Sequence, residues 1–169
     1  MLECVRYFLL PSRFLYAIIA ALNHFYHEKP GSFERFSPNE EQQVTFKILV
    51  VDDEPALRDL IGQMLELGGY AVQEASDGEE ALEMIDENPP DVVILDVMMP
   101  EMDGITVCKT LRANPTTAVL PIVMLSGKTQ REAVAEGLAA GANKYLCKPA
   151  SFEELMSSLE EVLSVTAVP

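Results

Sequence analysis

Short apolar runs alternate with amphipathic stretches along the chain from about residue 45 onward. The runs are nearly uncharged and rich in β-branched side chains, which is typical of strands that are buried on both faces of a sheet. Between the runs, apolar residues recur at the spacing of one helix face. The pattern predicts strands at residues 46–51, from residue 70, and at 92–95, 120–125 and 144–147, with a helix after each.

Residues with strong local preferences mark where the predicted helices begin and end. Pro55 suits the first turn of a helix, and the glycines at 68–69 suit its end. The prolines at 89–90 stop the second helix, and Ser151 with Glu154 has the spacing of a capping box before the last helix. Five strand–helix units with short connections predict an α/β fold, a doubly wound five-stranded parallel sheet with helices on both faces.

Composition narrows the class of protein. The 169 residues are 49% hydrophobic, which is enough for a packed core and excludes an intrinsically disordered chain. There are 27 acidic and 12 basic residues, and the net charge of −15 repels nucleic acid, so we expect no nucleic-acid partner. Cys4, Cys108 and Cys147 lie far apart, which argues against a disulfide scaffold or a zinc site and fits a reducing, cytoplasmic compartment.

The charge is unevenly distributed and divides the chain near residue 45. Residues 1–44 carry four basic and five acidic side chains, whereas residues 45–169 carry eight and 22. We expect an amino-terminal extension or linker at 1–45, one domain at 46–164 and a short tail at 165–169.

The extension contains an apolar stretch at residues 14–22 that is too short to span a bilayer. Four interpretations of it stay open. They are membrane contact of residues 1–25, an amphipathic docking or dimerising helix, a poorly ordered segment, and upstream sequence translated in error.

Polar side chains follow four of the five predicted strands. Asp52 and Asp53 follow the first strand, Asp96 the third, Ser126 the fourth and Lys148 the fifth. Chemistry in open parallel sheets collects at the carboxyl ends of the strands. We therefore expect the three carboxylates and the ammonium group to lie within a few ångströms of each other.

Three carboxylates at such distances repel each other. Two unit charges about 4 Å apart cost roughly 4 kcal/mol at an effective dielectric constant near 20, and Lys148 offsets only part of this. A hard divalent cation would relieve the rest, so we predict a Mg²⁺ site at Asp53 and Asp96, with Asp52 joined to the metal through water. A cation beside a carboxylate and a lysine is also a receptacle for a phosphoryl group, which the carboxylate attacks.

A single aspartate after a strand is usually a helix cap or a solvated loop residue, but the joint pattern is far more specific. Four stretches carry it, at residues 48–55, 96–104, 123–127 and 141–149. Over about residues 46–164, the sequence resembles the receiver domain of two-component response regulators, such as the chemotaxis regulator. The resemblance implies the flavodoxin-like strand order 2-1-3-4-5.

The resemblance also implies a role for each acidic residue and for the lysine. Asp96 would be the phosphoacceptor, which attacks a phosphohistidine of a partner kinase to give an aspartyl phosphate. Asp52 and Asp53, together with Asp96 and the backbone carbonyl of Met98, would hold Mg²⁺. Lys148 would pair with the phosphoryl group.

A conformational switch is a further implication of the resemblance. Ser126 matches the hydroxyl that moves toward the phosphoryl oxygen, and Tyr145 matches the aromatic ring that turns inward when it does. From the residue pattern alone, Tyr145 is a strand aromatic packed beneath a helix. The bond between Lys148 and Pro149 is expected to be cis, and Gly127 would leave the phosphoryl group open to water.

These roles predict a single-domain response regulator rather than an enzyme. It would accept a phosphoryl group from a histidine kinase or a histidine phosphotransfer protein onto Asp96, with Mg²⁺. Because no output domain follows the last predicted helix, it would act by docking to a protein target through residues 130–140, 144–146 and 152–163.

Two other functions fit parts of the pattern. A phosphohydrolase of the haloacid dehalogenase type also uses an aspartate after a strand with Mg²⁺, but it needs a second acid two residues later, where this chain has Met98. A degenerate receiver would only bind proteins, and the complete set of acids, hydroxyl and lysine argues against it.

Overall fold

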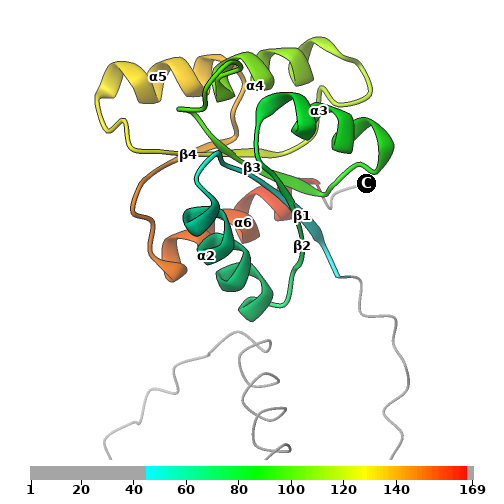
Figure 1. Cartoon of the computed structure of the whole chain (residues 1–169), viewed down its shortest axis with the longest axis vertical. Coiled ribbons are helices and arrows are strands. Elements are labelled where there is room, and N and C mark those ends of the chain that lie inside the picture. The colour runs from blue at the N-terminus through cyan, green and yellow to red at the C-terminus, as the bar shows by residue number, and fades with distance from the viewer. Residues whose placement is uncertain (1–44, 167–169) are drawn as a thin grey trace, which may run out of the picture. The chain divides into compact units, whose positions relative to one another are not determined.

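The computed structural model describes residues 45–166. They form a five-stranded parallel sheet with the strand order β2-β1-β3-β4-β5, as expected. The strands are β1 (Lys47–Val51), β2 (Ala71–Ala75), β3 (Val92–Asp96), β4 (Ile122–Ser126) and β5 (Lys144–Cys147). Figure 1 shows the sheet as the middle layer, with helices above and below it.

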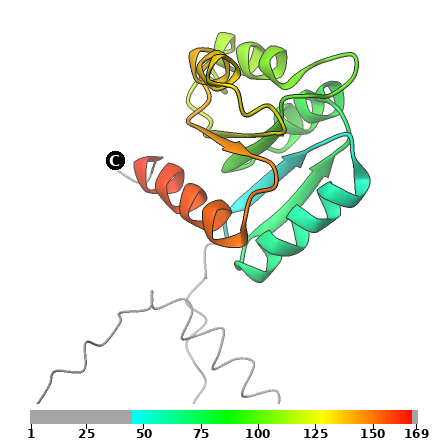
Figure 2. The same cartoon turned by 90° about the vertical axis from the view of Figure 1, so that its left-hand side faces the viewer.

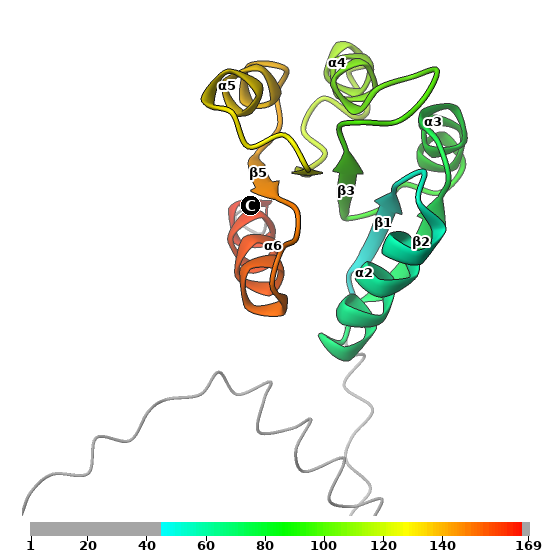
Figure 3. The ribbon, with the colours of Figure 1, turned by 60° about the vertical axis from the view of Figure 1, so that its left-hand side comes forward.

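Five helices alternate with the strands in this part of the chain. They are α2 (Pro55–Leu67), α3 (Gly78–Glu87), α4 (Gly104–Ala113), α5 (Arg131–Ala139) and α6 (Phe152–Thr166). Helices α2 and α6 cover one face of the sheet, and α3, α4 and α5 cover the other (Figure 1, Figure 2). Figure 3 shows α2 alongside β1 and β2, and α6 alongside β5. The predicted doubly wound α/β fold is therefore confirmed.

A separate apolar core fills each side of the sheet. Leu49 and Val51 of β1 belong to the core beneath α3, α4 and α5, whereas Ile48 and Val50 belong to the core beneath α2 and α6. Each of these four residues is at most 1% exposed. Burial on both faces explains why the strand sequence is an uninterrupted apolar run rather than an alternating one.

Local signals at the helix ends act as predicted. Ser151 Oγ accepts a hydrogen bond from the Glu154 amide (3.2 Å), and the Glu154 carboxylate accepts one from the Ser151 amide (2.9 Å), which completes the capping box. Pro55 is the first residue of α2, and Gly69 just beyond that helix has φ of 85°, a left-handed conformation that favours glycine.

Most strand ends lie within one residue of the expectation, and two other boundaries differ by more or for an identifiable reason. Strand β4 starts at Ile122 rather than at residue 120, because Pro121 has no amide and pairs with β3 only through its carbonyl, which accepts from the Val93 amide (2.9 Å). Helix α6 continues to Thr166, slightly past the expected end of the domain at residue 164, since no glycine or proline interrupts it.

The expected extension lies outside the described residues except for Thr45. The same holds for the apolar stretch at 14–22, for the suggested membrane contact of residues 1–25, and for residues 167–169 of the expected tail. Within the residues that the structure does describe, no helix has the length and apolar character needed to cross a bilayer.

Candidate functional site

The carboxylates at the ends of β1 and β3 lie together at the carboxyl edge of the sheet. These strands are neighbours, and Val51 pairs with Leu95, so Asp52, directly after β1, and Asp96, the last residue of β3, lie side by side. One carboxylate oxygen from each of Asp52, Asp53 and Asp96 lies within 4.8 Å of the other two. Asp52 and Asp96 are 2% and 4% exposed, whereas Asp53 is exposed. The three acids therefore converge as predicted.

Lys148, directly after β5, completes this cluster. Its Nζ lies 2.7 Å from Asp52 Oδ2 and 3.1 Å from Asp96 Oδ2. The Lys148 amide donates to the Ser126 carbonyl (2.8 Å), and the bond to Pro149 is cis, as expected. Burial alone would lower the pKa of Lys148, but the hydrogen bond to Asp52 and the charge of Asp96 outweigh it, so this pKa lies above its usual value.

The carboxylate oxygens in the cluster differ in what they bind. Asp52 Oδ1 accepts from the Glu54 amide (2.9 Å) and Oδ2 accepts from Lys148, so both oxygens have protein partners. Asp96 Oδ1 is buried and has no hydrogen-bond partner among the described residues. Within residues 45–166, the Asp53 carboxylate takes part in no hydrogen bond or ion pair.

The donor set fits a hard divalent cation. Free carboxylate oxygens on Asp53 and Asp96 are the ligand type that Mg²⁺ prefers, and a single lysine leaves the three acids with excess negative charge. Because Asp52 already has a partner for each oxygen, it suits the expected contact through water better than direct ligation. The cluster of acids therefore fits a divalent cation such as Mg²⁺, and the role of each individual ligand stays a prediction.

Ser126 and Tyr145 both bind the backbone of Lys128, in the loop between β4 and α5. Ser126 is fully buried, and its Oγ accepts a hydrogen bond from the Lys128 amide (3.1 Å). The half-buried Tyr145 donates from its hydroxyl to the Lys128 carbonyl (2.9 Å). The ring lies against Gly137, where a Cβ would be 2.8 Å from Tyr145 Cδ2. The two predicted switch residues are thus connected through one loop residue.

The loop after β3 passes close to Asp96. A Cβ on Gly104 would lie 2.0 Å from the Asp96 carbonyl oxygen, so glycine is needed for α4 to begin this near the strand end. Met98, whose carbonyl is an expected metal ligand, belongs to the same loop and its side chain is half exposed. A Cβ on Gly127 would meet only the tip of that side chain, at 3.3 Å.

A model of the response regulator receiver domain matches residues 48–160 of the chain. The chain belongs to the response regulator receiver family. This receiver is therefore a phosphoacceptor signalling domain of two-component systems rather than a conventional enzyme, and the phosphohydrolase interpretation does not apply.

Curated relatives match the receiver over part of their length. Response regulator MprA of Mycobacterium sp. (strain KMS) is 47% identical over 124 residues, which is 72% of this chain and 52% of MprA. The DNA-binding dual master transcriptional regulator RpaA of Synechocystis sp. is 39% identical over 120 residues, which is 71% of this chain and 50% of RpaA. The receiver chain thus spans about half the length of the curated relatives it matches.

Solved structures match the same part of the receiver. Chemotaxis protein CheY4 of Vibrio cholerae has a TM-score of 0.67 at 39% identity, covering 70% of this chain and 99% of that one. The receiver domain of the Francisella response regulator 1452 has a TM-score of 0.68 at 36% identity, covering 72% and 99%.

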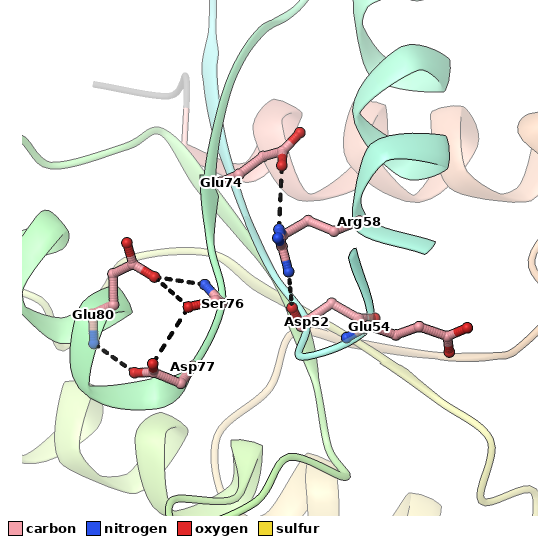
Figure 4. A network of polar contacts seen from close by, with 7 residues as sticks. All are labelled: Asp52, Glu54, Arg58, Glu74, Ser76, Asp77 and Glu80. Atoms are coloured by element: carbon pink, nitrogen blue, oxygen red, sulfur yellow. Dashed lines mark hydrogen bonds and ion pairs between the residues drawn. The ribbon is translucent and has the colours of Figure 1, made fainter. Parts of the chain in front are cut away.

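Sequence analysis missed a second set of groups beside the acidic pair of this receiver. Arg58 of α2 donates from Nη1 to the Asp52 carbonyl (2.7 Å) and from Nε to the Glu74 carboxylate (3.2 Å) (Figure 4). In the same view, the Glu80 carboxylate accepts from the amide and the hydroxyl of Ser76, both at 2.7 Å, and holds the turn between β2 and α3. Arg58 lies close to the acidic pair in the sequence, but this proximity does not identify a backbone carbonyl as its partner.

Proposed function

We propose that this receiver accepts a phosphoryl group on Asp96, with Mg²⁺ bound beside it. The donor is the phosphohistidine of a histidine kinase or of a histidine phosphotransfer protein. The observation that carries the proposal is the state of the Asp96 carboxylate: Lys148 holds Oδ2, whereas Oδ1 is buried among acidic neighbours without a hydrogen-bond partner in the described residues. Lys148 thus orients the Asp96 carboxylate, and one of its oxygens makes no hydrogen bond among the described residues.

The chain's own residues have distinct tasks in this reaction. One Asp96 oxygen attacks phosphorus, so that an O–P bond forms and the P–N bond to the donor imidazole breaks, with its electron pair left on nitrogen. Asp53, Asp96 and the Met98 carbonyl would hold Mg²⁺ directly, and Asp52 would bind it through water. Bound there, the ion neutralises charge on the phosphoryl oxygens. Lys148 adds a second positive charge beside Asp52 and Asp96.

The phosphoryl group would act through a population shift. It stabilises the arrangement in which Ser126 and Lys148 contact its oxygens, at the expense of the arrangement without these contacts. In support, both Ser126 and Tyr145 bind the backbone of Lys128. Ser126 accepts from its amide, and Tyr145 donates to its carbonyl. A movement of the serine hydroxyl would therefore change its hydrogen bond to Lys128, the residue whose carbonyl accepts from Tyr145.

The output would be a protein-docking face formed by α5, β5 and α6. Tyr145 lies on β5, its ring lies against Gly137 of α5, and an ion pair joins Lys144 of β5 to Glu161 of α6, so all three elements connect to the switch. We propose that the receiver acts as a single domain on a protein target, in the same compartment as its kinase, the cytoplasm. The acidity of residues 45–169 supports a protein rather than a nucleic-acid partner.

Loading with acetyl phosphate and Mg²⁺, followed by intact mass, tests the proposal. Wild type should gain one phosphoryl group, and Asp96→Asn should gain none. The matched control Asp86→Asn removes an exposed carboxylate elsewhere, on α3, and should load like wild type. Equal loading of Asp96→Asn would move the site to another residue. Failure of wild type to load would favour the degenerate receiver.

A further inference from the structure

Arg58 binds the backbone of the acidic pair rather than its carboxylates. Its Nη1 donates to the Asp52 carbonyl at 2.7 Å, and its side chain is 15% exposed (Figure 4). On the other side of the same residue, the Asp52 amide donates to the Ala75 carbonyl of β2 (3.2 Å). Both peptide groups that flank Asp52 therefore have partners from neighbouring elements.

Glu74 holds the guanidinium of Arg58 in this place, and Gly62 leaves room for Glu74. The Glu74 carboxylate accepts from Arg58 Nε at 3.2 Å and offsets its charge. Gly62, one helical turn along α2, leaves space for this carboxylate, because a Cβ there would lie 3.0 Å from Glu74 Oε1. Helix α2 thus supplies both the arginine and the room for its anionic partner on β2.

The Asp52 carbonyl belongs to the peptide plane that leads into Asp53. A change in the ψ angle of Asp52 that the φ angle of Asp53 does not offset turns this plane and the Cα–Cβ bond of Asp53 together, and with them the carboxylate. Within residues 45–166 the Asp53 carboxylate has no hydrogen bond of its own that would hold its direction. Its direction toward Asp96 therefore depends on the backbone, and the backbone is held at this plane by Arg58.

We propose that Arg58 is a positioning residue for the Mg²⁺ site, which directs Asp53 toward Asp96 by fixing the peptide between Asp52 and Asp53. The proposal rests on the proposed function, because it assumes that the acids bind Mg²⁺. A role as a nearby charge has the opposite sign: removing a cation beside the site would strengthen Mg²⁺ binding. The direction of the change in affinity therefore decides between positioning and charge.

Isothermal titration with Mg²⁺ on the full chain tests this. The main variant is Arg58→Met, which keeps the apolar stem but removes every N–H donor. We expect its dissociation constant to rise about tenfold, as for groups that orient metal ligands without touching the metal. Arg58→Lys keeps the charge and one donor group, so its constant should lie between those of wild type and Arg58→Met. With saturating Mg²⁺, loading by acetyl phosphate should return close to the wild-type rate.

Two controls isolate the effect. Lys109→Ala removes an equal charge from an exposed position on α4 and should leave Mg²⁺ affinity unchanged. Thermal unfolding without Mg²⁺ reports whether each variant is folded. Unchanged or tighter Mg²⁺ binding by folded Arg58→Met overturns the proposal. If that variant does not fold, wild-type affinity in Arg58→Lys overturns it. Absence of Mg²⁺ binding in wild type would instead overturn the proposed function.

Discussion

Lys148 Nζ and Asp52 Oδ2 lie 2.7 Å apart in an ion pair between residues 96 positions apart in the sequence. The same ammonium reaches Asp96 at 3.1 Å, so one cation serves two carboxylates that are almost completely buried. Asp53 adds a third negative charge that the lysine does not contact. Lys148 thus links two of the three acids, and the site carries excess negative charge that a cation would offset.

Replacing Lys148 should destabilise the metal-free protein. Lys148→Met leaves Asp52 and Asp96 buried without a counter-charge, which costs about 3 kcal/mol in the free energy of unfolding. Mg²⁺ should restore part of the loss, because it supplies positive charge to the same carboxylates. Denaturant unfolding of both proteins, with Mg²⁺ and with a chelator, measures this. Equal stability of the two proteins without metal would contradict the role of the ion pair.

The contribution of Lys148 should also depend on pH in a defined direction. Its pKa in the folded protein is raised above the ordinary 10.5, so the stability it adds is fully present below that pH and is lost as pH rises through the folded pKa. The difference in unfolding free energy between wild type and Lys148→Met should stay constant from about pH 7 to about pH 9 and shrink in more alkaline buffer. A difference that already fades below pH 9 would show that another group is responsible.

Removing the Asp53 carboxylate should separate stability from metal binding. Asp53→Asn loses no hydrogen bond or ion pair within the described residues and removes one charge from three crowded acids. Unfolding in chelator should therefore become harder, by up to about 1 kcal/mol for a solvent-screened charge, and added Mg²⁺ should no longer stabilise the protein. Asp59→Asn, at an exposed position on α2, is the control that should keep its response to Mg²⁺. A full Mg²⁺ response in Asp53→Asn would remove Asp53 from the site.

The fold was predictable because each strand and helix leaves a periodic pattern of apolar residues. The cluster was predictable for a related reason: parallel strands end at one edge, so residues as distant as Asp52 and Lys148 meet there. Boundaries were less predictable, as at β4, where the pairing of Pro121 through its carbonyl alone decides the start of the strand.

Contacts to backbone atoms leave no pattern in the sequence that is as strong as the periodicity of apolar residues. Arg58 binds a carbonyl, and every residue has one, so no pattern of side chains points to that partner. The contact between Gly137 and Tyr145 depends on the crossing of α5 over β5 and on one side-chain rotamer, neither of which the spacing of apolar residues determines.

Gly104 should be essential for the conformation around Asp96. Gly104→Ala would place Cβ 2.0 Å from the Asp96 carbonyl oxygen, and a backbone atom cannot move aside as a flexible side chain does. We expect a loss of about 3 kcal/mol or more in the free energy of unfolding. Gly127→Ala is the matched control, since its Cβ would meet only Met98 Cε at 3.3 Å, and it should unfold within about 0.5 kcal/mol of wild type. Similar losses in both variants would show that the close approach is not the cause.

Gly137 should determine where the Tyr145 ring lies. A glycine inside a helix costs about 1 kcal/mol relative to alanine, so its presence in α5 needs a packing reason. The structure supplies one, because an alanine Cβ would lie 2.8 Å from both Tyr145 Cδ2 and Met124 Sδ. Gly137→Ala should therefore displace the ring, break the hydrogen bond from its hydroxyl to Lys128, and shift the Tyr145 ring resonances in NMR spectra.

A double-mutant cycle separates this contact from general damage to α5. Gly137→Ala should lower the free energy of unfolding of the wild-type domain. In a Tyr145→Ala background the ring is gone, so the same substitution should be less harmful by about 1 kcal/mol or more, because alanine is favoured over glycine in a helix. Met124 contributes equally to both backgrounds and cancels. Denaturant unfolding of the four proteins gives the coupling energy. A coupling near zero, with Gly137→Ala equally harmful in both backgrounds, would show that the glycine serves Met124 or the helix rather than the tyrosine ring.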